Sequence, residues 1–142
     1  MKNSLVFFLL SAAFFVSCKK DTAVYVVTDP TSLDNATVFS TGKFAFSDER
    51  YDEGIVKIYL RKDGVYVLGL EQMNYQTAFF DTNIYLSSTP QLTTTSIKIF
   101  SAKKLHGNIY YPMSSGMNVA ALKYLIIQGD TDANPVASAT LQ

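Results

Sequence analysis

Short runs of β-branched and aromatic residues recur along the chain from residue 43 onward, with turn residues between them. Ile55 to Arg61 shows the alternation most clearly, because three aliphatic residues share one face of an extended chain there. Lys62-Asp63-Gly64 follows as a hairpin signal, and the run from Val65 to Leu70 returns. This part of the chain therefore predicts two antiparallel strands joined by a tight turn.

The same pattern predicts further strands and only one helical turn, at Asn118 to Leu122. Ala23 to Val27 could add one more strand near the start of the chain. Strands at this even spacing, without a long amphipathic helix, are typical of an antiparallel β-sandwich or a barrel-like domain of about 8–9 short strands. The predicted fold class is therefore all-β. The remaining expected strands are Lys43–Phe46, Asn83–Ser87, Ser96–Phe100, Asn108–Tyr111, Tyr124–Gln128 and Val136–Leu141.

A different pattern opens the chain. Lys2 precedes an apolar run from Leu5 to Val16 that only Ser11 interrupts. As a helix this run would rise about 18 Å, which is short of the ~30 Å of hydrocarbon that a membrane-spanning helix must cross. A basic start followed by a short apolar core is typical of a secretory signal, which is removed from the mature protein.

The only cysteine follows this run, in the sequence Phe15-Val16-Ser17-Cys18-Lys19-Lys20-Asp21. This sequence resembles a lipobox of the kind found in Bacteroidetes-type lipoproteins, which implies that the thiol of Cys18 receives diacylglycerol. Two or three acyl chains, such as palmitate, hold a protein stably at a membrane. Ordinary signal-peptidase cleavage near Ser17 is the alternative. We expect lipidation, because a lone exposed thiol is a liability in an oxidising compartment.

These features predict the organisation and the location of the chain. Residues 1–17 are expected to form a lipoprotein signal peptide, residues 18–40 a lipid-anchored tether and residues 41–142 a β domain. The expected location is the bacterial cell envelope, either in the periplasm or at the outer-membrane surface.

Composition narrows the function classes. The chain has 48% hydrophobic and 17% charged residues, which is too apolar for a disordered segment. Its formal net charge is +0, so it lacks the basic character of a nucleic-acid-binding protein. A single cysteine allows no intramolecular disulfide and no cysteine-based metal site.

Between Thr41 and Leu141, several short blocks occur in a fixed order. They are Gly42-Lys43-Phe44; Gly54-Ile55-Val56; Asp63-Gly64 followed by Leu68, Leu70, Glu71 and Met73; Asp81 with Ile84-Tyr85-Leu86-Ser87; Leu105, Gly107-Asn108, Tyr110 and Pro112; Leu125-Ile126-Ile127; and Ala137 to Leu141. These blocks, in this order, resemble the electron-transfer DM-thirteen domain family. The family is a β-rich extracellular module, and the resemblance implies a redox role. In the family, the cysteine that is proposed to carry the redox chemistry belongs to a Trp-Cys pair. The corresponding residues here are Ile127 and Gln128, so the thiol that the redox role needs is absent from this position.

Two acidic groups are candidate calcium ligands. Asp130, Asp132 and Asn134 have the every-second-residue spacing that opens a calcium-binding loop, although a polar turn between the last two strands explains them equally well. The second group is Asp48-Glu49 with Asp52-Glu53, for which a solvated turn is the alternative.

Aromatic and basic residues supply the other candidates. Tyr110 and Tyr111 must point to opposite faces of a strand, so at least one is a surface candidate for binding a sugar ring or a partner protein. His106 is the only histidine; it could ligate haem with help from Met113 or Met117, or it is an exposed turn residue. No catalytic constellation is present, and we assign no catalytic residue.

We therefore expect a membrane-anchored extracytoplasmic β-domain lipoprotein that is a non-catalytic binding or adhesion module without a cofactor. Its expected partners are the membrane, through the lipid anchor, and a glycan or a surface protein, but no nucleic acid. The alternative is a redox or electron-transfer domain that uses a bound cofactor such as haem. Calcium is a further candidate, through the acidic groups.

Overall fold

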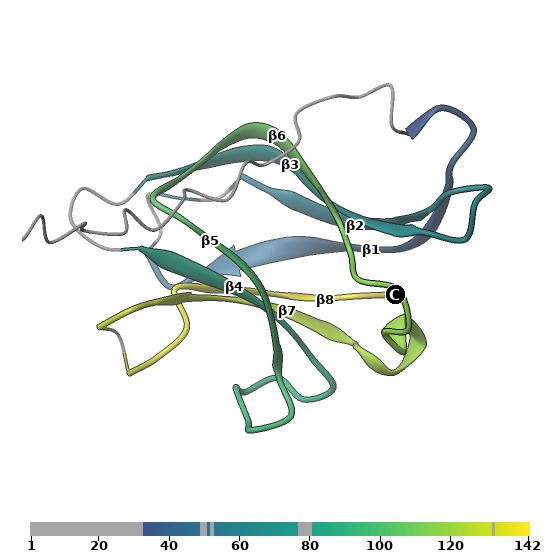
Figure 1. Cartoon of the computed structure of the whole chain (residues 1–142). Coiled ribbons are helices and arrows are strands. Elements are labelled where there is room, and N and C mark those ends of the chain that lie inside the picture. The colour runs from purple at the N-terminus through teal and green to yellow at the C-terminus, as the bar shows by residue number, and fades with distance from the viewer. Residues whose placement is uncertain (1–32, 49–50, 52, 77–80, 132) are drawn as a thin grey trace, which may run out of the picture.

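The computed structural model describes residues 33–48, 51, 53–76, 81–131 and 133–142. Within these ranges the chain forms eight strands and one described 3-10 turn (Figure 1). The strands are β1 (Thr37–Phe46), β2 (Ile55–Leu60), β3 (Tyr66–Gln76), β4 (Thr82–Ser87), β5 (Ile97–Ala102), β6 (Lys104–Pro112), β7 (Tyr124–Gly129) and β8 (Ala137–Thr140), and the turn is η2 (Val119–Ala121).

The strands form one antiparallel sheet in the order β5-β4-β7-β8-β1-β2-β3-β6. The sheet curls into a nearly closed barrel, as Figure 1 shows. Its two edge strands, β5 and β6, are separated along the chain by Lys103 alone. The ring of Phe100 on β5 stacks on that of Tyr111 on β6, with centroids 5.1 Å apart. The predicted all-β, barrel-like fold is confirmed.

Most predicted strands recur with shifted ends. The turn at Lys62-Asp63-Gly64 joins β2 to β3; the Val65 N–H donates to Asp63 Oδ1, and Gly64 adopts φ 81°. The two largest differences are in β3, which continues six residues past its predicted end to Gln76, and in β1, which begins at Thr37, inside the range assigned to the tether. Thr37 and Val38 belong to the sheet because they pair with β2. The helical turn predicted at 118–122 is confirmed as η2, and Ala23–Val27 lies outside the described residues.

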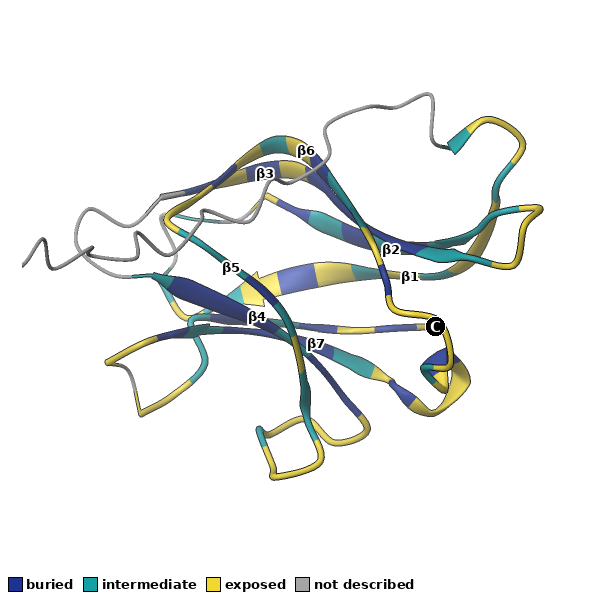
Figure 2. Cartoon of the chain, in the orientation of Figure 1, coloured by how far each residue is buried: buried dark blue, intermediate teal, exposed yellow. Residues whose placement is uncertain are grey.

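Alternate residues of the strands fill the interior of the barrel. Figure 2 shows buried positions along the strands and exposed ones at the turns. Fully burying one aliphatic side chain contributes about 1.5–3 kcal/mol to folding, so this cluster supplies the main stabilisation in a fold without a disulfide. Interior side chains with 0% relative exposure are Val56, Ile58, Leu68, Leu70, Ile84, Leu86, Leu105, Leu125 and Ile127.

A β-bulge interrupts β3 at Glu71 and Gln72. Leu70 pairs with Ile109 and Met73 with Gly107, so two residues of β3 lie opposite one residue of β6. Gln72 takes a left-handed conformation with φ 55°, and its N–H donates to Asn108 Oδ1 at 2.9 Å. The extra residue resets the alternation, so Leu70 and Met73 both stay in the core while Glu71 points outward.

Gly42 allows β1 to change partners. Residues 37–43 of β1 pair with β2, and residues 44–46 pair with β8. A Cβ at Gly42 would lie 2.4 Å from the carbonyl oxygen of Thr140, which is closer than two such atoms can approach. Glycine is therefore required where the end of β8 lies against β1.

We expect Gly42→Ala to lower the free energy of unfolding by about 1–3 kcal/mol, because the methyl group must displace backbone atoms of β8. Urea denaturation followed by circular dichroism measures this. Gly64→Asn is the matched control; asparagine tolerates the left-handed conformation, no atom lies within 4 Å of a Cβ there, and the change should stay within about 0.5 kcal/mol. Equal effects of the two substitutions would contradict the steric argument.

Candidate functional site

The face of β1, β2, β3 and β6 that turns away from the core is called the outer face here. Its residues form rows across the strands, as the pairing of neighbouring strands shows. One end of the outer face is apolar and the other is polar. The rows, from the apolar end, are Val38-Tyr59-Val67-Pro112, then Thr41-Lys57-Gly69-Tyr110, then Lys43-Ile55-Glu71.

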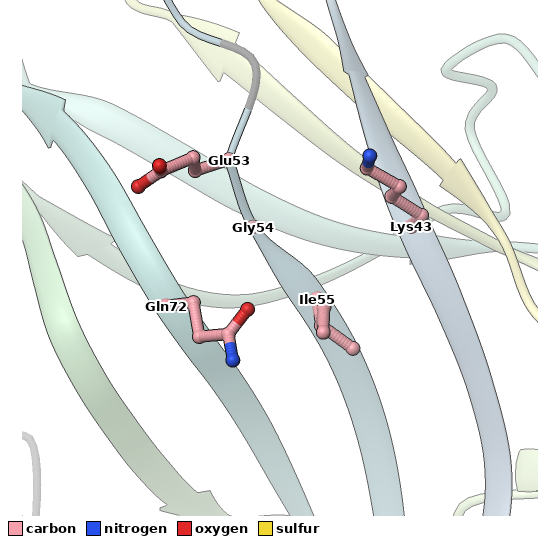
Figure 3. Close-up of a pocket in the computed structure, with 5 residues that line it drawn as sticks. All are labelled: Lys43, Glu53, Gly54, Ile55 and Gln72. Carbon is pink, nitrogen blue, oxygen red and sulfur yellow. The ribbon is translucent and has the colours of Figure 1, made fainter.

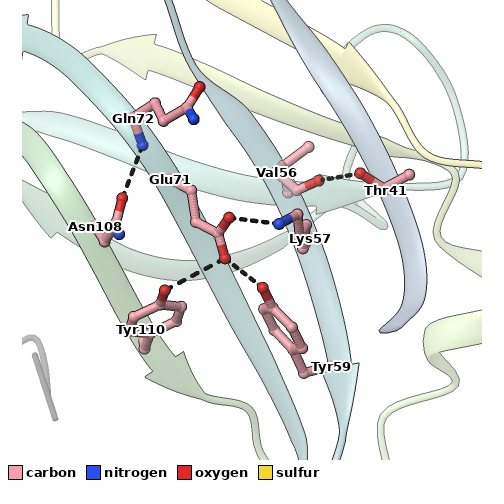
Figure 4. Close-up of polar contacts among 8 residues, drawn as sticks. All are labelled: Thr41, Val56, Lys57, Tyr59, Glu71, Gln72, Asn108 and Tyr110. Atoms are coloured by element: carbon pink, nitrogen blue, oxygen red, sulfur yellow. Dashed lines mark hydrogen bonds and ion pairs between the residues drawn. The ribbon is translucent and has the colours of Figure 1, made fainter. Parts of the chain in front are cut away.

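Glu71 is the centre of a polar cluster on the outer face (Figure 4). Lys57 Nζ lies 2.6 Å from Glu71 Oε2 and forms an ion pair with it. The hydroxyl of Tyr59 donates a short hydrogen bond to Oε1, and the hydroxyl of Tyr110 donates to the same oxygen at 3.3 Å. Three side chains from β2 and β6 thus converge on one carboxylate of β3, and we call these four residues the Glu71 cluster.

Gly69 makes room for the two tyrosine rings. It lies two residues before Glu71 on β3, and a Cβ there would come within 2.9 Å of the Tyr59 ring and 3.1 Å of the Tyr110 ring. The rings meet edge to face, with centroids 6.2 Å apart. Because each hydroxyl is also bonded to Glu71, both rings are held in one orientation above the sheet.

The environment of the cluster shifts the pKa values of its members. Burial by itself would raise the pKa of Glu71, but hydrogen bonds from Lys57 and Tyr59 and the charge of Lys57 lower it below the ordinary 4.5. Burial, followed by the hydrogen bond to Glu71 and its charge, raises the pKa of Tyr59 well above 10. Burial and the Glu71 charge also raise the pKa of Tyr110. At neutral pH Glu71 is ionised and both tyrosines are protonated.

A hollow of about 370 Å³ borders the cluster at the polar end of the outer face (Figure 3). It is lined by Lys43, Glu53, Gly54, Ile55 and Gln72. The bulge at Gln72 brings that side chain to the hollow, next to Ile55, which pairs with Glu71. In the part of the chain that the structure describes, no hydrogen bond or ion pair engages the side chains of Lys43 and Glu53. Both therefore stay available to a ligand.

The two predicted surface tyrosines separate as the strand geometry requires. Tyr111 packs against the core beside Phe100, whereas Tyr110 points to the outer face and belongs to the Glu71 cluster. Tyr110 is thus the member of the pair that remains a binding candidate.

The structure tests the calcium candidates only in part. Asp130 and Asn134 lie in the turn between β7 and β8, where Asn83 Nδ2 donates to Asp130 Oδ1. Asp132 lies outside the described residues, as do Glu49 and Asp52 of the second acidic group. Among the described residues, no group of three or more His, Cys, Asp or Glu side chains could share a metal ion.

The haem candidates are not brought together. His106 is exposed on β6 and pairs with Asn74, near the end of β3. Met113 is buried beside the opposite end of β3, where its N–H donates to the carbonyl of Tyr66. Met117 packs against the core. Gln128, which takes the place of the resembled family's cysteine, lies on β7. The redox alternative stays a prediction.

Cys18 lies outside the described residues, so its predicted lipidation stays a prediction as well. Over the residues that the structure does describe, no helix is long and apolar enough to cross a membrane.

Sequence reasoning missed most of this site. Lys57, Tyr59 and Glu71 look like ordinary alternating strand residues, and Glu71 entered only as part of a resemblance. A usable signal was the polar Glu71-Gln72 pair inside a strand that is otherwise apolar at its core positions, since such an interruption is typical of a bulge. Comparisons of the chain with models of protein families, with curated proteins and with solved structures found no match.

We expect Glu71→Gln to lower the free energy of unfolding by about 1–2 kcal/mol at pH 7, because the amide keeps an acceptor for the tyrosines but loses the charge-assisted bond to Lys57. The folded pKa of Glu71 lies below 4.5, so its contribution is present above that pH and is lost as the pH falls through the folded value. The difference between the two proteins should therefore disappear in acid. Urea denaturation at a series of pH values measures it.

Asp63→Asn is the matched control for that series. It removes the charge from the Arg61–Asp63 pair, whose side chains are 35% and 49% exposed, and should change stability by less than about 0.5 kcal/mol. A Glu71→Gln effect as small as this, or one that persists unchanged in acid, would contradict the role given to the Glu71 charge.

Proposed function

We propose that this protein is a lipid-anchored, non-catalytic binding domain of the bacterial cell envelope, and that the polar end of its outer face holds a polyhydroxylated ligand such as a glycan. The lipobox-like sequence around Cys18 supports the envelope location. The observation that carries the binding role is the hollow with the unengaged side chains of Lys43 and Glu53, which borders the Glu71 cluster at Ile55 and Gln72; the two tyrosines that Glu71 holds lie in the adjoining rows of the same face.

Rigid tyrosines favour binding for an energetic reason. A surface side chain that is immobilised by a ligand loses about 0.5–1.5 kcal/mol of rotamer freedom. Tyr59 and Tyr110 have already lost much of that freedom, because Glu71 holds both hydroxyls and their rings pack over Gly69. A tyrosine also combines an apolar ring with a polar tip, which suits the mixed surface of a sugar.

The lining of the hollow favours an uncharged ligand. Lys43 offers a positive donor, Glu53 a negative acceptor and Gln72 an amide that can do both. Sugar hydroxyls donate and accept hydrogen bonds, so they can use all three groups. A strongly anionic or cationic ligand would be attracted by one charge and repelled by the other.

The backbone of Gln72 adds a second reason. A left-handed conformation costs a non-glycine residue roughly 1–2 kcal/mol, and residues held in this way cluster at binding sites. Here the strained residue is the one that the bulge places at the hollow. Gln72 supplies an amide at the hollow that glycine, which adopts this conformation without the cost, would lack.

We expect Gln72→Gly to raise the free energy of unfolding by roughly 0.5–1 kcal/mol, because glycine relieves the backbone strain. The same substitution should weaken glycan binding about tenfold, because the side-chain amide is lost. Binding is measured by screening the detergent-solubilised protein on an oligosaccharide array, followed by calorimetry with the best binder. Asn35→Gly is the matched control, since Asn35 also has positive φ (63°) but does not line the hollow; it should leave binding unchanged. Full binding by Gln72→Gly would place the ligand elsewhere.

The anchor is tested separately. Cys18→Ala should move the protein from the membrane fraction to the soluble fraction, because no thiol remains to carry the acyl chains, and intact mass spectrometry of the unaltered protein should show the mass of the lipid. Ser17→Ala, which keeps a small residue before the cysteine, should remain in the membrane fraction. A lipid-free mature protein would refute the anchor. It would not affect the proposed glycan binding at the hollow, which the Gln72→Gly substitution tests.

A further inference from the structure

Val38 and Phe39 are the two exposed large hydrophobic residues on the part of the domain that the structure describes. Their relative exposures are 55% and 41%, and no other large hydrophobic residue of the described ranges is exposed. Single exposed apolar residues are common on protein surfaces, but two that are consecutive and outside every buried cluster call for a physical explanation.

A second bulge produces this exposure. Val38 pairs with Tyr59 and Ser40 with Ile58, so Phe39 is the extra residue of β1 and has no cross-strand partner on β2. Its ring meets Tyr66 edge to face, with centroids 5.1 Å apart, and Tyr66 in turn packs against the core cluster, so the Phe39 ring lies over the edge of the core. Val38 continues the apolar row of the outer face beside Tyr59. We call Val38 and Phe39 the rim patch.

The rim patch lies where the chain enters the domain. The described chain begins at Leu33 and β1 begins at Thr37, immediately before the patch. Fifteen residue steps separate Leu33 from Cys18, which limits their distance to about 54 Å even when fully extended. The exposed Lys62, in the turn between β2 and β3, lies at the same end of the barrel, because Thr37 pairs with Leu60 (Figure 1).

We infer that the rim patch rests in the interfacial zone of the membrane that carries the lipid anchor, so that the domain is held with this end toward the bilayer. The inference rests on the proposed lipidation of Cys18. An anchored domain has already lost most of its translational freedom, so two apolar side chains are enough to favour one orientation. Lys62 would then lie near the phosphates of the lipid headgroups.

A second copy of the chain is a poorer occupant. A stable dimer buries about 1,200–2,000 Å² in total, with a well-packed apolar centre. Two residues at a strand end are too small a centre for such an interface. The neighbouring turn residues Arg61, Lys62 and Asp63 are charged, and Lys62 and Asp63 are exposed to water. A membrane interface has no such minimum area.

The test uses the absence of tryptophan from the chain, which makes an introduced tryptophan the only one in the protein. Lipidated Phe39→Trp protein is reconstituted into phosphatidylcholine vesicles containing phosphatidylglycerol, with or without lipids brominated near the headgroup. We expect a blue-shifted emission that the brominated lipids quench about twofold, because an interfacial side chain lies within about 5–10 Å of the headgroup boundary. His106→Trp is the control; His106 is exposed on β6, six residues before Pro112 of the apolar row, and its emission should not be quenched.

The outcomes separate this inference from the proposed function. A lipidated protein whose Phe39→Trp emission is unquenched overturns the orientation and leaves the anchor intact. Equal quenching at both positions also overturns it, because the domain would then have no preferred face. An emission shift that follows protein concentration and ignores the brominated lipid indicates a second copy and overturns the membrane occupant. Quenching of a protein without lipid on Cys18 supports the rim patch and refutes the anchor.

Discussion

The bulge at Glu71 and Gln72 is the constraint on which the outer face depends. β3 must keep Leu70 and Met73 in the core on either side of it, and strict alternation cannot do this across two intervening residues. Glu71, next to Leu70, faces outward by ordinary alternation and meets Lys57 and the two tyrosines, whereas the bulge returns Met73 to the core. The bulge also places Gln72, in a left-handed conformation, at the edge of the hollow. The packing of the core and the shape of the candidate site therefore both depend on the bulge in β3.

The Glu71 cluster stabilises the fold and shapes the site at the same time. Its carboxylate accepts hydrogen bonds from β2 and β6, so it connects three neighbouring strands on the side of the sheet that the core does not cover. With its acceptors occupied inside the cluster, Glu71 is better suited to hold the tyrosines than to contact a ligand itself. The unengaged groups at the hollow, Lys43 and Glu53, are the ones left to do so.

The outer face changes character along the strands, from the apolar row that contains Val38 to the polar row that contains Lys43. Two bulges define its ends, since one places Phe39 at the rim and the other places Gln72 at the hollow. An arrangement with the apolar end toward a membrane and the polar end away from it would present the hollow to ligands outside the bilayer. This links the proposed anchor, the proposed ligand and the proposed orientation through one surface.

Local patterns in the sequence predict the all-β class, the tight turn at Asp63-Gly64 and the approximate strands, because alternation and turn chemistry act between residues a few positions apart. They also separate Tyr110 from Tyr111, since neighbours on a strand face opposite ways. By contrast, the start of β1 at Thr37 and the contacts of Glu71 with Tyr59 and Tyr110 follow from tertiary packing. Those contacts join residues 12 and 39 positions apart and depend on strand order, register and bulges, which arise when the whole sheet packs around its core.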